Sequence, residues 1–153
     1  LGEARSERER WLLRPGGPVS VSLPNLGALQ ADVGENRWCY LDIPHHVTHF
    51  TPEGLAAALG VAGFTEPSMH WWSEEYELFG WYQTLLNQLT ASHNYFYNRA
   101  KKGKRADAGP HPTWTAIATM AGPLLLPVVL LFSLWAFAAS KPSCVEMHAS
   151  VPR

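Results

Sequence analysis

The chain has 153 residues, which is enough for one domain of ordinary size with a hydrophobic core. Apolar residues make up 46% and charged residues 16%, a composition that excludes an intrinsically disordered tail. The formal net charge of −1 provides no global basic field for nucleic acid. Cys39 and Cys144 lie far apart without metal-type spacing, so they indicate neither a disulfide framework nor a zinc ribbon.

The first fourteen residues alternate acidic and basic side chains, some of them at helical spacing, and contain no apolar core of the kind a signal peptide has. We therefore predict the solvated end of a helix here and no signal peptide. Because the chain opens on Leu1 and not on Met, we expect it to be a piece of a longer protein.

A strand is predicted over residues 18–24, after the tight turn Pro15-Gly16-Gly17. Val19, Val21 and Leu23 alternate there with polar residues. This period of two is typical of a strand with one apolar face.

Residues 25–50 have no clean period, so we predict a long loop with a short helix over 26–31. Loops of this length inside a compact domain are usually functional. A helix is then predicted to begin with Thr51 as its N-cap and Pro52 at its first position, and to end at Gly63.

The stretch 64–70 is a weak strand candidate because Pro67 interrupts it. A second helix is predicted over residues 79–98, whose apolar side chains fall near one face. Residues 100–112, with basic residues, glycine and proline, are predicted to be a linker.

No Asp, Glu, Lys or Arg occurs from Ala108 to Ser140, and residues 114–140 are long and apolar enough to cross a bilayer. The core helix of a soluble protein normally has a shorter uncharged, apolar stretch, so we predict contact with membrane lipid. The basic run at 101–105 lies shortly before this segment, where lysine and arginine usually bind anionic lipid. Nucleic acid is therefore not expected as a partner.

Four stretches carry a resemblance to a known family. They are Leu13-Arg14-Pro15-Gly16-Gly17, Leu23-Pro24-Asn25, Pro44-His45-His46-Val47-Thr48-His49-Phe50-Thr51-Pro52 and Leu59-Gly60-Val61-Ala62-Gly63-Phe64. Their order and spacing resemble the C-terminal half of class I S-adenosylmethionine (SAM)-dependent methyltransferases, most closely the bacterial branch similar to the ubiquinone-biosynthesis O-methyltransferases. In that family the first stretch leads into the fifth strand, the third into the last helix and the fourth into the sixth strand.

The resemblance implies an α/β fold: the C-terminal half of a Rossmann-like methyltransferase sheet, with an inserted apolar helical hairpin or membrane segment. Residues 1–110 are then a partial methyltransferase domain, 111–140 an apolar membrane-associated segment, and 141–153 the final antiparallel strand with the C-terminus. The implied cofactor of the parent protein is SAM. The sequence has no G-x-G-x-G-like loop and no acidic residue closing a second strand, so we expect this chain alone not to bind it.

Three histidines are candidates for the site. His45, His46 and His49 follow the predicted strand, beyond the end where active sites of open α/β sheets lie. Taking a proton from an acceptor hydroxyl needs a base, and a His side chain with pKa ~6.5 suits that task. The resemblance implies a catalytic role for His46 and His49 and substrate contact for His45, with structural loop roles as the alternative. Zinc is not predicted, because the prolines around His45 and His49 disfavour the helix that their spacing requires.

Three further residues are site candidates. Asn25 follows the strand and is predicted to contact the cofactor, although Asn is also a routine turn residue. Trp38 and Tyr40 are predicted to wall a hydrophobic substrate pocket, with loop packing as the alternative.

The predicted function is SAM-dependent methyl transfer to an oxygen, or another heteroatom, of a small or lipid-linked acceptor at the cytoplasmic face of the membrane. The alternative is a non-catalytic, membrane-anchored module that binds a partner or lipid. A glycine loop encoded upstream of Leu1, followed ~20 residues later by Asp or Glu, would favour the enzyme.

Residues 143–149 are predicted to form a short strand, which the resemblance pairs with residues 19–23. Both flanks of 114–140 then lie on one side of the bilayer, which excludes a single crossing. Gly122-Pro123 and Pro127 interrupt the helical hydrogen bonds. The charge bias of the flanks, taken alone, favours a crossing. Because the strand pairing and the prolines favour a reversal, we predict a hairpin that dips into one leaflet.

Overall fold

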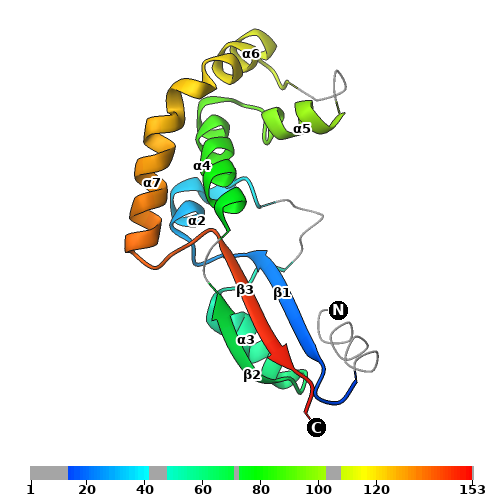
Figure 1. The fold of residues 1–153 in the computed structure, drawn as a ribbon. Helices are drawn as coiled ribbons and strands as arrows, with labels where there is room; N and C mark the ends of the chain where they lie inside the picture. Colours follow the sequence, from blue (N-terminus) through cyan, green and yellow to red (C-terminus); the bar gives the residue numbers. More distant parts are fainter. Residues whose placement is uncertain (1–13, 42–47, 71–72, 103–107, 153) are drawn as a thin grey trace.

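The structure is a computed structural model that describes residues 14–41, 48–70, 73–102 and 108–152. The described elements, in chain order, are β1 (Pro18–Pro24), α2 (Leu29–Gly34), η1 (Glu35–Arg37), α3 (Pro52–Val61), β2 (Thr65–His70), α4 (Glu74–Leu89), α5 (Tyr95–Lys102), α6 (Pro112–Met120), η3 (Gly122–Leu125), α7 (Leu126–Ala138) and β3 (Cys144–Ser150) (Figure 1). The fold is mixed α/β, as predicted, with a small antiparallel sheet.

The sheet has the strand order β1-β3-β2. The final strand, β3, pairs antiparallel with both neighbours, so that Met147 lies opposite Val21 on one side and Met69 on the other. Since both partners are antiparallel to β3, β1 and β2 run in the same direction. The predicted pairing of the last strand with residues 19–23 is confirmed.

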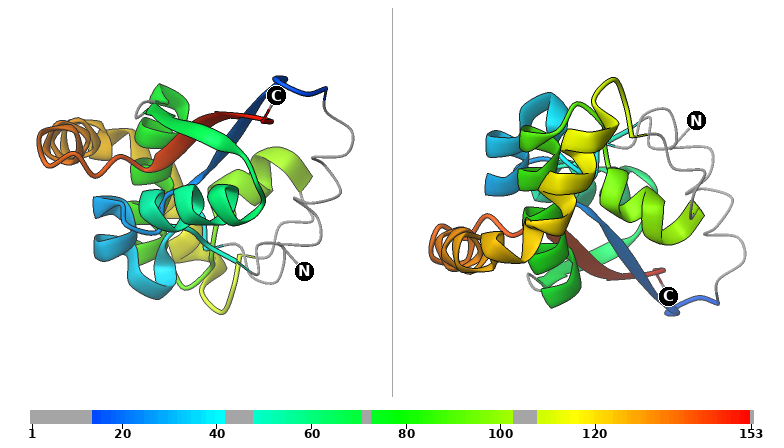
Figure 2. Two further views of the ribbon diagram at one scale, coloured as in Figure 1. Left: turned by 90° about the horizontal axis from the view of Figure 1, so that it is seen from below. Right: turned by 90° about the horizontal axis from the view of Figure 1, so that it is seen from above.

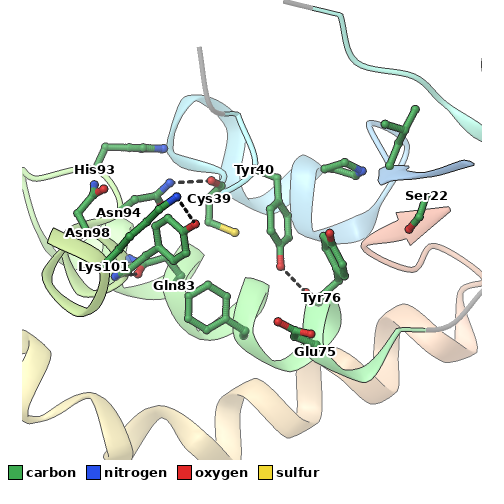
Figure 3. A pocket seen from close by; sticks show the side chains of 14 residues that line it. Ser22, Cys39, Tyr40, Glu75, Tyr76, Gln83, His93, Asn94, Asn98 and Lys101 are labelled. Atoms are coloured by element: carbon green, nitrogen blue, oxygen red, sulfur yellow. Dashed lines mark hydrogen bonds between the residues drawn. The ribbon is translucent and has the colours of Figure 1, made fainter. Parts of the chain in front are cut away.

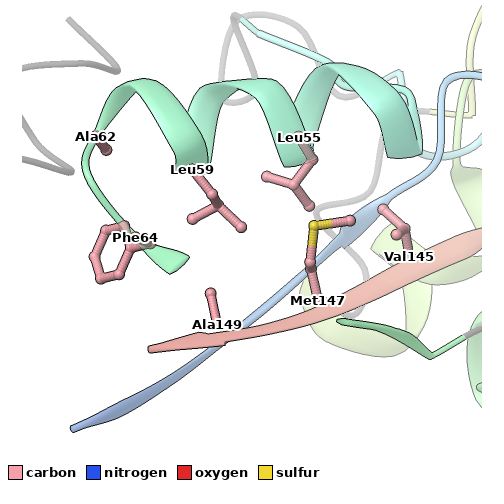
Figure 4. Close-up of a cluster of buried hydrophobic side chains, with 7 residues drawn as sticks. All are labelled: Leu55, Leu59, Ala62, Phe64, Val145, Met147 and Ala149. Atoms are coloured by element: carbon pink, nitrogen blue, oxygen red, sulfur yellow. The ribbon is translucent and has the colours of Figure 1, made fainter. Parts of the chain in front are cut away.

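Helix α3 covers one face of this sheet (Figure 4). It begins where the sequence predicts, because Thr51 Oγ1 accepts a hydrogen bond from the backbone nitrogen of Gly54 and caps the helix. It ends at Val61, and the predicted stop signal Gly63 follows with a φ of 79°, the left-handed conformation that glycine adopts at little cost. The buried side chains between helix and sheet are those of Leu55, Leu59, Ala62, Phe64, Val145, Met147 and Ala149.

A helical layer extends beyond the sheet (Figures 1 and 2). Helix α4 lies between α2 and α7, and Trp81 of α4 is completely buried there with Leu29, Val129 and Ala136. The Trp81 ring stacks on Phe132 of α7 with ring centroids 4.7 Å apart. This second core is separate from the one under α3 and fixes α7 along α4.

The predicted helix over residues 79–98 is two helices in the structure. Helix α4 ends at Leu89 because Thr90 turns to an extended backbone, and the single proton of its hydroxyl is shared between the carbonyls of Leu86 and Ser92. Asn94 has a φ of 54°, which asparagine tolerates better than most residues. Short polar side chains that bond the nearby backbone compete with helix continuation, and they redirect the chain into α5.

The predicted break in the apolar segment is present, but its two arms do not fold back on each other, and the dip into one leaflet stays a prediction. Helix α6 and the η3–α7 run meet at a bend of 56°, whereas a hairpin needs a near reversal. Pro123 and Pro127 stand in the first turns of η3 and α7, where proline costs no helical hydrogen bond, so each begins a new helix without turning the chain back. Within the described residues, no single helix is both long and apolar enough to cross a membrane.

Candidate functional site at the end of strand β1

A pocket of about 630 Å³ lies beside the C-terminal end of β1 (Figure 3). Strand β1 contributes its last three residues, and helices α4 and α5 provide much of the rest. The residues that line it are Ser22, Leu23, Pro24, Cys39, Tyr40, Glu75, Tyr76, Phe79, Gln83, His93, Asn94, Tyr97, Asn98 and Lys101. The position agrees with the general location of sites in open α/β sheets, outside the carboxyl ends of the strands.

Opposite charges stand toward the two ends of this pocket. Glu75, in the first turn of α4, lies near Tyr76 on the side of Ser22, while Lys101 of α5 lies at the far end (Figure 3). The Lys101 ammonium donates a hydrogen bond of 3.3 Å to the Tyr97 hydroxyl and lies 5.4 Å from the centre of that ring. The pocket therefore offers a carboxylate at one end and a cation held on an aromatic face at the other.

The wall formed by Cys39 and Tyr40 is chemically inert at neutral pH. The Tyr40 hydroxyl donates a hydrogen bond of 3.0 Å to the carbonyl of Tyr76, and the two rings lie 5.4 Å apart. Burial raises the pKa of Tyr40 well above its ordinary value and raises the pKa of Cys39 to about 12. Neither group is a base or a thiolate nucleophile there, so they shape the pocket.

Amide side chains fix α5 against α4. Gln83 Oε1 accepts a hydrogen bond of 3.0 Å from the backbone nitrogen of Tyr97, and its Nε2 donates to Asn87 Oδ1 at 2.9 Å. Asn87 Nδ2 donates to Asn94 Oδ1, and Asn94 Nδ2 donates to the carbonyl of Cys39, at 2.9 and 2.8 Å. The chain of amides ties α4, the start of α5 and the Cys39 loop together, so these groups hold the pocket's shape.

A second polar network lies under the pocket, between α4 and β3. The carboxylate of Glu77 is buried and accepts hydrogen bonds from Trp81 Nε1 at 2.7 Å and from the backbone nitrogen and hydroxyl of Ser143. Gln30 Nε2 donates to the Ser143 hydroxyl at 2.9 Å, and Gln30 Oε1 accepts from Trp38 Nε1 at 3.1 Å. Both carboxylate oxygens accept hydrogen bonds, so Glu77 holds α4 against the start of β3.

Of the predicted substrate residues, Tyr40 lines the pocket and Trp38 does not. The Trp38 ring is buried next to it, 5.9 Å from both the Tyr40 and the His49 rings. Trp38 therefore supports the pocket wall from behind, which is the loop-packing alternative.

The predicted catalytic and cofactor residues lie outside the pocket lining where they are described. His49 is partly buried beside Trp38, and its Nε2 lies 3.3 Å from the carbonyl oxygen of Tyr40. Asn25 is buried, with Nδ2 donating to the carbonyl of Pro142 and Oδ1 accepting from Gly27, at 2.9 and 2.8 Å. These bonds account for Asn25 as a structural turn residue, and its cofactor contact stays a prediction. His45 and His46 lie outside the described residues.

Sequence reasoning missed the pocket residues of α4 and α5, above all Glu75 and Lys101. A carboxylate at the start of a helix and a lysine near the end of another are common dipole partners, so neither position stands out alone. The detectable signal was the aromatic and amide series Tyr76, Phe79 and Gln83, which recurs at helical spacing on one side of α4.

Across the described residues no three His, Cys, Asp or Glu side chains gather closely enough to hold a metal ion. No protein-family model matches the chain, and no match was found among curated proteins or solved structures.

Proposed function

We propose that this chain is the acceptor-side part of a class I SAM-dependent methyltransferase that methylates an oxygen, or another heteroatom, of a small or lipid-linked acceptor at the cytoplasmic face of a membrane. The order of the four resembling stretches motivates the proposal. The arrangement of the sheet supports it: the Pro15-Gly16-Gly17 turn leads into β1, Gly63-Phe64 leads into β2, and the last strand lies antiparallel beside β1. A Rossmann-like parent sheet is part of this proposal.

The observation that carries the proposal is the place of the pocket. It lies at the carboxyl end of β1, which corresponds to the fifth strand in the resemblance, and it is lined by aromatic rings and a few charged groups. A pocket of this volume accommodates a drug-sized acceptor.

The residues present do not fit SAM itself. The sequence has no glycine-rich loop between a strand and a helix, and Asn25 already uses both polar atoms of its side chain within the chain. The cofactor therefore belongs to the upstream part of the parent protein, and this chain supplies the acceptor side.

Glu75 is the candidate base of that side. Its carboxylate can take the proton of an acceptor hydroxyl placed between Ser22 and Tyr76, leaving the oxygen as the nucleophile. Lys101 can hold an anionic group at the acceptor's other end. His46 and His49 remain the bases that the resemblance implies.

Substitution in the complete enzyme tests these assignments. We expect Glu75→Gln to lower turnover by at least a hundredfold with SAM affinity nearly unchanged, as for loss of a general base. His49→Ala and His46→Ala serve as rival variants, and Asn98→Ala, on the opposite wall, is the control. Full turnover in Glu75→Gln, together with loss of turnover in either histidine variant, would show that a histidine and not Glu75 is the base.

A second candidate function is a non-catalytic, membrane-anchored module that binds a partner or lipid. The lack of a glycine loop in this sequence and the apolar surface of α6 and α7 favour it. Calorimetry of the complete protein with SAM separates the two: saturable micromolar binding supports the enzyme, and none supports the module.

A further inference from the structure

The outer face of α6, η3 and α7 exposes large apolar side chains along its whole length. Helix α7 stands at the outer side of the molecule and touches the rest along one narrow stripe, with only Val129, Ser133 and Ala136 buried (Figure 2). We define the outer face by its exposed members, which are Trp114, Ile117, Met120, Leu124, Leu126, Val128, Leu130, Leu131, Leu134, Trp135 and Phe137.

Exposure of so many large apolar side chains on one segment is unusual for a monomer in water. Met120 is 83% exposed, Leu124 79% and Leu131 67%, and no charged residue occurs from Ala108 to Ser140. The largest apolar patch of a typical soluble monomer covers ~300–600 Å², and larger patches mark protein or membrane contacts. A helix that is apolar all round is normally covered on every side.

We propose that the outer face is a membrane-docking surface, which lies within one leaflet of a lipid bilayer and does not cross it. This rests on the membrane association in the proposed function and is independent of methyl transfer. Crossing is disfavoured because α4 lies along α7 and would enter the hydrocarbon core with it. The buried Glu77, Gln83 and Asn87 of α4 are hydrogen-bonded to the backbone of Ser143, α5 and η1, and these segments would have to enter the bilayer with α4.

A lipid surface fits this face better than a second copy of the chain. A protein interface carries about one hydrogen bond per 100–200 Å² and a polar rim, but α7 exposes no hydrogen-bonding side chain besides Trp135. Trp114 and Trp135 are half exposed, and tryptophan prefers the headgroup level of a bilayer. Basic residues at positions 102, 104 and 105 precede α6 in the sequence, and lysine and arginine next to a membrane-bound segment add affinity for anionic lipid.

The pocket stays outside the bilayer in this arrangement. Three of the α4 residues that line it, Tyr76, Phe79 and Gln83, lie on a different side of the helix from Trp81 and Leu85, which pack toward α7. The acceptor's reacting group therefore reaches the pocket from the aqueous side, even when α7 is inserted.

Vesicle flotation tests the proposal with the chain as it is. We expect the chain to float with phosphatidylcholine vesicles and more strongly with vesicles that contain one quarter phosphatidylglycerol. Leu131→Glu with Leu134→Glu should reduce binding at least tenfold. The control is Val61→Glu, which places one glutamate at an apolar side chain 76% exposed on α3 and should bind as before, whereas Leu131→Glu alone should already bind less. Circular dichroism checks that each variant is folded.

Depth labelling tests whether the face crosses. Cysteines replace Met120 and Phe137 one at a time, in a background with Cys39→Ser and Cys144→Ser, and carry a fluorophore that external dithionite reduces. With the chain added to preformed vesicles, both labels should be reduced. Protection of one of them establishes a crossing and overturns the proposal.

A face that joins two protein chains gives a different pattern. If light scattering shows a dimer that Leu131→Glu with Leu134→Glu dissociates, and vesicles bind neither protein, the outer face is a protein interface and the lipid proposal fails. The methyl-transfer proposal is measured by SAM binding and turnover, so either proposal can fail without the other.

Discussion

Ser143 donates two hydrogen bonds to one carboxylate oxygen of Glu77, from its backbone nitrogen at 2.9 Å and its hydroxyl at 2.7 Å. Glu77 belongs to α4, and Ser143 immediately precedes β3. This contact therefore joins the helical layer to the central strand of the sheet, across 66 positions of sequence.

Ser143→Ala should weaken that joint. It removes one donor to Glu77 and leaves Gln30 Nε2, in a fully buried place, with only its 3.4 Å hydrogen bond to the carbonyl of Glu77. We expect the free energy of unfolding to fall by ~1–3 kcal/mol, the usual cost of removing a hydrogen-bond partner from buried polar groups. Urea unfolding measures it. Ser20→Ala, which removes an exposed hydroxyl bonded to Glu146, should change stability by less than ~0.5 kcal/mol.

Two glycines should respond oppositely to alanine. A Cβ at Gly80 would lie 2.6 Å from Gln30 Nε2 and 2.7 Å from the Tyr40 ring, so Gly80→Ala must displace the pocket wall. A Cβ at Gly60 meets nothing within 4 Å. We expect Gly80→Ala to destabilise by more than ~1 kcal/mol and Gly60→Ala to stabilise α3 by ~0.5–1 kcal/mol. Equal melting temperatures for the two variants would contradict this packing.

Alkaline pH should destabilise the fold through Cys39. Burial raises the pKa of this thiol from 9.0 to about 12, so the unfolded chain releases the proton above pH 9 while the folded chain keeps it. The resulting stabilisation is complete below pH 9 and is lost as the pH rises toward 12, by at most ~1.4 kcal/mol for each pH unit. Urea midpoints at pH 7.5, 9 and 10.5 should decline, and the decline should be shallower in Cys39→Ser. An identical slope in both proteins would place the effect elsewhere, first at Tyr40.

Ser133 offers a stabilising substitution. Its hydroxyl is buried in the packed stripe of α7 and has no hydrogen-bond partner in the described structure. We expect Ser133→Ala to raise the free energy of unfolding, by up to ~1 kcal/mol, because the variant no longer buries an unpaired hydroxyl. Thr115→Val is the contrasting variant: its hydroxyl donates to the carbonyl of Ala108 at 2.9 Å, so it should lose ~1 kcal/mol. A loss of stability in Ser133→Ala would show that the hydroxyl has a partner in solution.

Local signals made part of the fold predictable. The alternation of Val19 and Val21 with serines predicted β1, and Thr51 and Gly63 marked the ends of α3 correctly, because caps and strand periods depend on neighbours in sequence. The end of α4 was missed because the stop comes from the Thr90 hydroxyl, a weak signal within an apolar helical pattern.

The candidate site was less predictable because its parts meet only in three dimensions. Tyr40 was found as a pocket wall, yet its partners Glu75 and Lys101 come from helices whose packing depends on the Gln83 and Asn94 amides. The bend of the apolar segment was predicted from its prolines, but its angle follows from the contact of α7 with α4. Tertiary contacts of this kind produce no periodic pattern in the local sequence from which they could be predicted.

The central strand of the sheet is synthesised after every other element that the structure describes. Ser20 and Glu146 are paired across 126 positions, so β1 and β2 must wait for β3 before either acquires a backbone partner in the described sheet. Contacts of such long sequence separation slow folding, and unpaired strands are prone to aggregate meanwhile. During synthesis the apolar residues of α6 and α7 emerge before β3, so early capture of those helices by lipid would shelter the nascent chain while the sheet is still open.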